Sequence, residues 1–172
     1  FALPKSVSSI GYAAFYGCSD LTSFSIEAGS VLETIDDWAF IRTALTSFVL
    51  PKSVSIISEA AFYECSDLTS FSIEAGSVLE TIVDEVFAYS GLTSFVLPKS
   101  VLSIGYGAFY RCPDLTSFST EAGSVLETID EFAFTRTGLT SITLPSSVSS
   151  IGKSAFYGCS DLALVVFEKP SA

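Results

Sequence analysis

The chain has 172 residues, of which 49% are hydrophobic, so it can bury a sizeable core and is not expected to be disordered. The net charge of −11, from 19 acidic and 8 basic residues, argues against binding to nucleic-acid phosphates. Because histidine is absent, a Ser-His-Asp triad, a Cys-His dyad and the usual zinc sites are excluded. No apolar run approaches the ~20 residues that span a bilayer, so we expect no membrane insertion of this segment.

The sequence repeats itself with a fixed period of 47 residues. The segment LPKSV begins at Leu3, Leu50 and Leu97, and the variant LPSSV begins at Leu144. A fixed period of this size indicates an array of stacked units. We therefore predict that residues 1–172 form a single repeat domain, with double repeats starting near these four leucines. Since the chain contains no methionine, we interpret it as a piece of a longer array.

Each unit divides into two halves, of 24 and 23 residues, that carry apolar residues in the same order. In chain order, LTSFSI at residues 21–26 has the alternation and the β-branched and aromatic content of a short strand. A compact turn follows at residues 27–29, then a second short extended piece, and then a tight turn or single helical turn of the kind written AFYGC at residues 14–18. One such coil cannot bury its own apolar side, but stacked coils can, so the pattern predicts a solenoid.

The consensus LPxSVxxIGxxAFYxCxxLTSF resembles the BspA-like class of leucine-rich repeats over essentially the whole chain, as about seven repeats. The resemblance implies a curved right-handed solenoid with a parallel β-sheet on its concave side and short strands, turns or single-turn helices on its convex side. It also implies a large secreted or cell-surface protein that binds other proteins or extracellular matrix. The alternate repeats, EAGSVLETIDDWAF, differ from the family pattern because they lack the proline and the cysteine and carry more acid.

Cysteine follows the turn phenylalanine by three residues in alternate coils, where the other coils have threonine or serine. The four cysteines are Cys18, Cys65, Cys112 and Cys159. Neighbouring coils lie about 4.8 Å apart, so successive cysteines should be roughly 10 Å apart. A disulfide requires Cα atoms within about 7 Å. We therefore predict small buried thiols that form no disulfide and share no metal ion.

Charged residues recur at two places along the array. Lysines and glutamates should interleave along one edge as an exposed ladder of ion pairs, worth at most ~1 kcal/mol each; they are Lys5, Glu27, Lys52, Glu74, Lys99 and Glu121. A second, acidic strip comprises Asp36, Asp37, Asp84, Glu85, Asp130 and Glu131. Calcium needs six or more oxygens, and these acidic pairs recur only in alternate coils, ~10 Å apart, so different coils do not supply them. Solvated surface is the favoured interpretation and a cationic partner is the alternative.

Three groups of residues are candidate partner contacts. The first is a field of small hydroxyls that the strands should expose, in which the candidates are Thr22, Ser25, Thr69, Ser72, Thr116 and Ser119. The alternative for this field is a Thr/Ser ladder that keeps a sheet soluble. The second is Trp38, at a position that varies between coils, and the third is Leu164 with Val166, which stand where earlier strands have hydroxyl residues or valine.

These features favour a non-enzymatic module for protein–protein or matrix interaction, of adhesion or scaffold type, that needs no cofactor. The localisation, secreted or cell-surface, follows from the family resemblance alone. The alternative is a structural subunit that self-associates end to end, or braces a larger assembly, through uncapped coils. An enzyme is disfavoured because, without histidine, only carboxylates could act as a general base.

Overall fold

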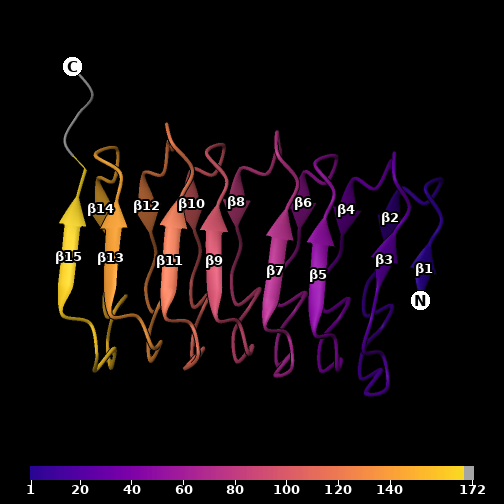
Figure 1. Cartoon of the computed structure of the whole chain (residues 1–172), viewed down its shortest axis with the longest axis horizontal. Helices are drawn as coiled ribbons and strands as arrows, with labels where there is room; N and C mark the ends of the chain where they lie inside the picture. Colours follow the sequence, from indigo (N-terminus) through magenta and orange to yellow (C-terminus); the bar gives the residue numbers. More distant parts are fainter. Residues whose placement is uncertain (169–172) are drawn as a thin grey trace.

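The computed structural model describes residues 1–168, which form a solenoid of about seven coils (Figure 1). Each coil has a strand on one side, a turn, a two-residue strand on the opposite side, and a longer turn that returns the chain. The odd-numbered strands are β1 (Ala2–Leu3), β3 (Ser25–Ile26), β5 (Ser47–Leu50), β7 (Ser70–Ile73), β9 (Ser94–Leu97), β11 (Ser117–Thr120), β13 (Ser141–Leu144) and β15 (Leu164–Phe167). The even-numbered strands are β2 (Ser9–Ile10), β4 (Thr34–Ile35), β6 (Ile56–Ile57), β8 (Thr81–Ile82), β10 (Ser103–Ile104), β12 (Thr128–Ile129) and β14 (Ser150–Ile151).

On the odd-numbered side, strands of neighbouring coils pair in parallel in twos: β1 with β3, β5 with β7, β9 with β11, and β13 with β15. β5 pairs with β7, which places Phe48 opposite Phe71 and Val49 opposite Ser72. β9 pairs with β11, and β13 with β15, in the same register. On the opposite side, β2, β4 and β6 form one sheet, and β8, β10, β12 and β14 form another. This pairing confirms the predicted parallel-strand solenoid, and it lines up equivalent residues in columns along the long axis.

The core is built around two columns of phenylalanine. One column comes from the odd-numbered strands β5, β7, β9 and β11 and from the residue before β3; it comprises Phe24, Phe48, Phe71, Phe95 and Phe118. The other comes from the longer turns and comprises Phe15, Phe40, Phe62, Phe87, Phe109, Phe134 and Phe156. Rings stack within a column, as Phe40 does on Phe62 with centroids 5.1 Å apart, and meet edge to face between columns, as Phe48 does with Phe62 at 4.9 Å. Both geometries stabilise aromatic pairs beyond the burial of area.

The longer turns are centred on the second phenylalanine column, and we call each five-residue segment a phenylalanine turn. They span residues 13–17, 38–42, 60–64, 85–89, 107–111, 132–136 and 154–158. Their backbone amides donate to the next coil, as Phe62 N–H does to the Val86 carbonyl at 2.9 Å. The alternative of a single helical turn is therefore wrong for residues 1–168, which contain no helix, and the alternative of a tight turn is correct.

Each phenylalanine turn also bends through two left-handed residues. One stands two residues before the phenylalanine and the other two residues after it, as in Ala60 with φ 53° and Glu64 with φ 54°. Eleven such residues are not glycine. The left-handed conformation costs an L-residue roughly 1–2 kcal/mol, so these turns are held by their hydrogen bonds to neighbouring coils.

We predict that Phe87→Ala destabilises the chain by about 3–5 kcal/mol, because the ring is fully buried between both columns and its loss leaves a cavity. Val96→Ala is the control: Val96 is 56% exposed on the outer face of β9, and its truncation should change stability by less than about 0.5 kcal/mol. Urea unfolding followed by circular dichroism measures both values. Equal effects of the two substitutions would contradict the assignment of the core.

Candidate interaction surface

The odd-numbered strands expose the predicted field of hydroxyls. The candidates Thr22, Ser25, Thr69, Ser72, Thr116 and Ser119 are all exposed on this face. Two valines interrupt the field: Val49 and Val96, each 56% exposed, lie directly opposite Ser72 and Ser119 in the neighbouring strands. The face therefore alternates hydroxyl and methyl groups from coil to coil and carries no charge of its own.

The threonines of this face use their hydroxyls partly within the protein. Thr69 Oγ1 donates to the Thr46 carbonyl at 3.2 Å, and Thr93 Oγ1 donates to the Thr69 carbonyl at 3.2 Å. The same bond recurs at Thr46 and Thr116, both at 3.4 Å. This ladder supports the alternative in which the hydroxyls stabilise and solvate the sheet, while their remaining lone pairs are still accessible to a partner.

A groove of about 550 Å³ lies where β3 and β5 run into their following turns. Its lining includes Ser25 and Val49 from the strands, and Lys52 and Glu74 from the turns. The groove adds a charged rim to the uncharged face, and its mixed lining could hold a small polar group of a partner.

Lysines and glutamates alternate along one edge as predicted, but they are joined by hydrogen bonds and not by the predicted ion pairs. Each glutamate carboxylate accepts a hydrogen bond from the backbone N–H of the neighbouring lysine, and not from its ammonium group. The bonds measure 3.0–3.1 Å and join Glu27 to Lys5, Glu74 to Lys52 and Glu121 to Lys99. Within residues 1–168 no ion pair forms along this edge. The predicted ion pairs are wrong because the carboxylate instead satisfies a turn amide, which leaves the ammonium in water.

The acidic strip also bonds to backbone amides. Asp37 Oδ1 accepts from Glu59 N–H at 3.0 Å, and Asp84 Oδ1 accepts from Tyr106 N–H at 2.8 Å, each in the next coil. Burial raises the pKa of the Glu85 carboxyl, and the nearby Glu59 and Asp84 raise it further. Over residues 1–168 no three histidine, cysteine or acidic side chains come together as a metal site.

The remaining candidates lie apart from the hydroxyl field. Trp38 is 41% exposed in a phenylalanine turn, where its ring contacts Tyr12 with centroids 5.5 Å apart. Leu164 and Val166 are 55% and 39% exposed on β15, opposite Ser141 and Thr143 of β13. The structure thus brings the six hydroxyl residues onto one face but places Trp38 on another side of the coil.

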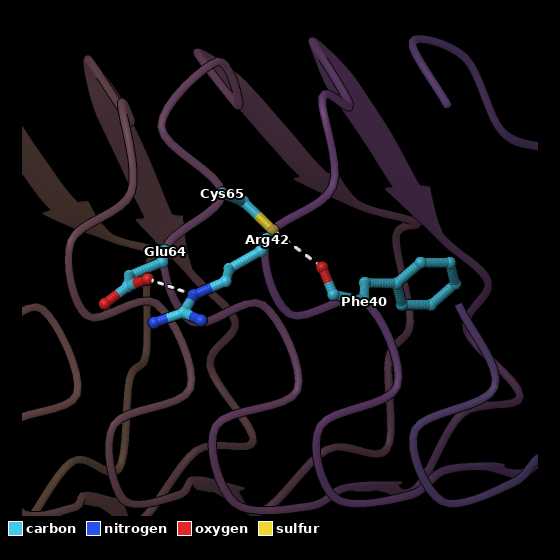
Figure 2. Close-up of polar contacts among 4 residues, drawn as sticks. All are labelled: Phe40, Arg42, Glu64 and Cys65. Atoms are coloured by element: carbon cyan, nitrogen blue, oxygen red, sulfur yellow. Dashed lines mark hydrogen bonds and ion pairs between the residues drawn. The ribbon is translucent and has the colours of Figure 1, made fainter. Parts of the chain in front are cut away.

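The cysteines form no disulfides, and the inner two are buried as predicted. Cys65 Sγ donates to the Phe40 carbonyl of the preceding coil at 3.0 Å (Figure 2), and Thr43 Oγ1 lies 3.4 Å from the sulfur. Burial raises the pKa of Cys112 to about 11, with Ser90 opposing the shift. Cys18 is exposed and Cys159 is half-buried, so the prediction of a buried thiol is wrong for Cys18, whose coil has little covering it.

One charged pair was not anticipated from the sequence. Arg42 Nε donates to Glu64 Oε2 between neighbouring phenylalanine turns (Figure 2), and it is the one ion pair within the described residues. Arg42 and Glu64 stand at the same position of successive coils, 22 residues apart. Both residues stand two positions after the turn phenylalanine, so an alignment of the coils on their phenylalanines would have predicted this ion pair.

Taken together, the period, the parallel pairing and the phenylalanine columns define the class of protein as a leucine-rich-repeat solenoid. The family model described as a BspA type leucine rich repeat region matches residues 1–116 and 80–171, in six copies. The chain belongs to this family. Among proteins with curated descriptions, none matches the sequence. No helix in residues 1–168 is long and apolar enough to cross a membrane.

Two solved structures are similar in fold. A leucine-rich repeat protein from Bacteroides ovatus is 24% identical, with a TM-score of 0.74 over 98% of this chain and 55% of that one. The pneumococcal vaccine antigen PcpA is 22% identical, with a TM-score of 0.60 over 98% of this chain and 62% of that one. The chain therefore spans less than two thirds of the length of either protein.

The thiols should differ in reactivity with Ellman's reagent, which needs an accessible thiolate. We predict that Cys18 reacts first in the native chain, and that Cys65 and Cys112 react only after unfolding, because burial raises the pKa of both. Release of thionitrobenzoate measures the rates, and Cys18→Ser should remove the fastest phase. Reaction of all thiols at one rate in the native chain would contradict the buried positions.

Glu85 should make stability depend on pH. Its pKa is raised in the folded chain, so the folded state holds this proton to a higher pH than the unfolded state does. Its ionisation therefore lowers stability as the pH rises from the ordinary pKa through the raised one. We predict that Glu85→Gln raises Tm slightly at pH 7 and leaves it unchanged near pH 4, measured by thermal unfolding. Glu127→Gln, an exposed glutamate with the same charge change, is the control; an equal gain there would contradict this explanation.

Proposed function

We propose that the chain is an interaction module of a secreted or cell-surface protein, binding another protein or extracellular matrix without catalysing a reaction. The observation that carries this proposal is the long, continuous exposed surface that the stacked coils present while their core stays fully buried. A rigid surface of this kind binds with little loss of conformational entropy. We also propose that the array is curved and right-handed, with the odd-numbered strands on its concave side.

Two further observations support this proposal. Family membership supports a binding role, because leucine-rich arrays bury a common core and expose extended surfaces. The description of the similar pneumococcal protein as a vaccine antigen supports a location outside the cell. The threonine hydroxyls donate to backbone carbonyls and not to carboxylates, which supports a structural use of these groups over a nucleophilic one.

A second candidate is association through β15. All four residues of this strand are exposed and apolar: Leu164, Val165, Val166 and Phe167. A further coil of a longer chain, or a second copy, would cover them. This alternative makes the contact between solenoid ends the main interaction.

Chemical cross-linking of the natural full-length protein on intact source cells tests both candidates. We expect protease added outside the cells to remove the protein, and mass spectrometry to find cross-links between this chain and a different protein. Cross-links only between copies of the chain would favour the end-to-end alternative. An intracellular location without any cross-linked partner would overturn the proposal.

A further inference from the structure

The side chains that distinguish one coil from another are concentrated in the phenylalanine turns. Residues 14–35 and 61–82 are identical except that Gly17 is replaced by Glu64, and residues 45–54 and 92–101 are identical throughout. The sheets therefore present the same residues in successive units. A partner that recognises one place on the array needs side chains that do not repeat. In the turns, tyrosine directly follows the phenylalanine once in every 47-residue unit, but the residue two positions after the phenylalanine varies from coil to coil: Gly17, Arg42, Glu64, Tyr89, Arg111, Arg136 and Gly158.

The turns also concentrate the residue types that dominate protein interfaces. All seven tyrosines, the single tryptophan and all three arginines of the chain lie in the phenylalanine turns or directly beside them. Tyrosine, tryptophan and arginine are the residues most enriched among binding hot spots. The hydroxyl field of the odd-numbered strands has none of them.

Five of these residues stand one or two positions after the phenylalanine in four successive turns, and we call them the turn stripe: Tyr89, Tyr110, Arg111, Arg136 and Tyr157. The Tyr89 and Tyr110 rings meet edge to face at 5.5 Å, and the Arg111 guanidinium lies 5.6 Å from the centroid of each. Backbone bonds of 2.8 Å from Tyr89 to Tyr110 and from Arg136 to Tyr157 fix the spacing between coils. The side chains of Tyr89, Tyr110 and Arg111 are therefore packed together before any partner arrives, which lowers the entropy cost of binding.

Three residues of the turn stripe are held in a strained backbone conformation. Tyr89, Arg111 and Arg136 have φ of 54–58°, at a position where the first and last phenylalanine turns have Gly17 and Gly158. Glycine would relieve this strain, because it has no Cβ. The same left-handed conformation occurs at this position in every phenylalanine turn, so the fold fixes the backbone from which these large side chains project.

The charges of the turn stripe select the partner. Arg42 is already paired with Glu64, whereas Arg111 and Arg136 have no carboxylate within ion-pair distance among residues 1–168. A guanidinium that lies against an aromatic ring still presents N–H donors that can hold a carboxylate. A polyanion without apolar groups is disfavoured, because two arginines offer it few cationic contacts and the net charge of −11 repels it; a short acidic segment meets the same repulsion but gains apolar contacts with the tyrosines. A partner segment with a few carboxylates beside apolar side chains is complementary to this surface, since the carboxylates can pair with Arg111 and Arg136 and the apolar groups can pack on the three tyrosines.

We propose that the turn stripe is the specific docking surface of the solenoid and that its occupant is an extended acidic segment of another protein, with aromatic or aliphatic residues beside its carboxylates. Four coils at about 4.8 Å spacing extend over roughly 15 Å, the length of about five extended residues. This inference rests on the proposed function as an interaction module, and it assigns the specific contacts to the turns and not to the hydroxyl field.

Fluorescence anisotropy with the full chain tests the proposal. The probes are a labelled peptide of Glu-Phe-Gly repeats, the same peptide with lysine in place of glutamate, and heparin as a polyanion without aromatic groups. We expect saturable binding of the glutamate peptide alone. Tighter binding of heparin, or equal binding of the lysine peptide, would overturn the proposal.

A matched pair of double variants locates the binding site. Arg111→Gln with Arg136→Gln should weaken peptide binding roughly tenfold or more. Lys5→Gln with Lys99→Gln makes the same charge change at the lysine–glutamate edge, away from the groove, and should leave the affinity within about twofold. Arg111→Lys should give an intermediate loss because lysine keeps the charge but not the planar stacking.

Circular dichroism and thermal unfolding establish that each variant keeps its fold. Equal weakening by the two double variants would overturn the proposal, as would no weakening by either. If the natural protein and its arginine double variant are cross-linked to a partner on cells equally well, the proposal that the turn stripe is the docking surface is wrong. The proposal that the chain is an interaction module is then still supported. If no partner is found at all, the proposed function itself fails.

Discussion

The structure depends on the stacking of one coil on the next at the spacing of a parallel sheet. Backbone hydrogen bonds and two columns of phenylalanine require the same spacing, since ring centroids such as those of Phe40 and Phe62 lie 5.1 Å apart. A coil that satisfies one set of contacts thereby satisfies the other. Equivalent residues then form columns, so a residue's place in the coil determines its neighbours on both sides.

This arrangement divides the surface into parts with different chemistry. The odd-numbered strands show a repeated hydroxyl and valine pattern whose threonines bond to one another's carbonyls. The lysine–glutamate edge uses its carboxylates on backbone amides and keeps its ammonium groups in water. The phenylalanine turns carry the tyrosines and arginines, differ from coil to coil, and hold several large residues in a left-handed conformation. The strands and the lysine–glutamate edge thus repeat from unit to unit, whereas the side chains of the phenylalanine turns differ.

The period, the strands, the buried phenylalanines and the inner cysteines could be predicted from the sequence because each depends on where apolar residues recur. The left-handed residues could not, since Trp38, Arg42 and Glu85 carry no sign of positive φ. Among the phenylalanine turns only Gly17, Gly107 and Gly158 indicate it. The sequence predicts that the edge glutamates pair with lysine ammonium groups, but they accept from lysine backbone N–H groups. Residue order shows that the two residues are close, but not that a turn amide lacks a partner. The turn stripe was missed for a related reason, since its residues are adjacent only across coils.

The near-identity of the units has a genetic consequence. Residues 14–35 and 61–82 differ at one position, so, synonymous codons apart, their coding sequences need differ by one codon only, and closely matched tracts favour unequal recombination. Gain or loss of one 47-residue unit would join coils whose contacts are the same as those they replace, and the hydrophobic interior would close without a cavity. The number of coils can therefore change within a lineage while the fold stays intact, and each new unit brings one more cysteine-containing coil and one more pair of turns on which surface residues can diverge.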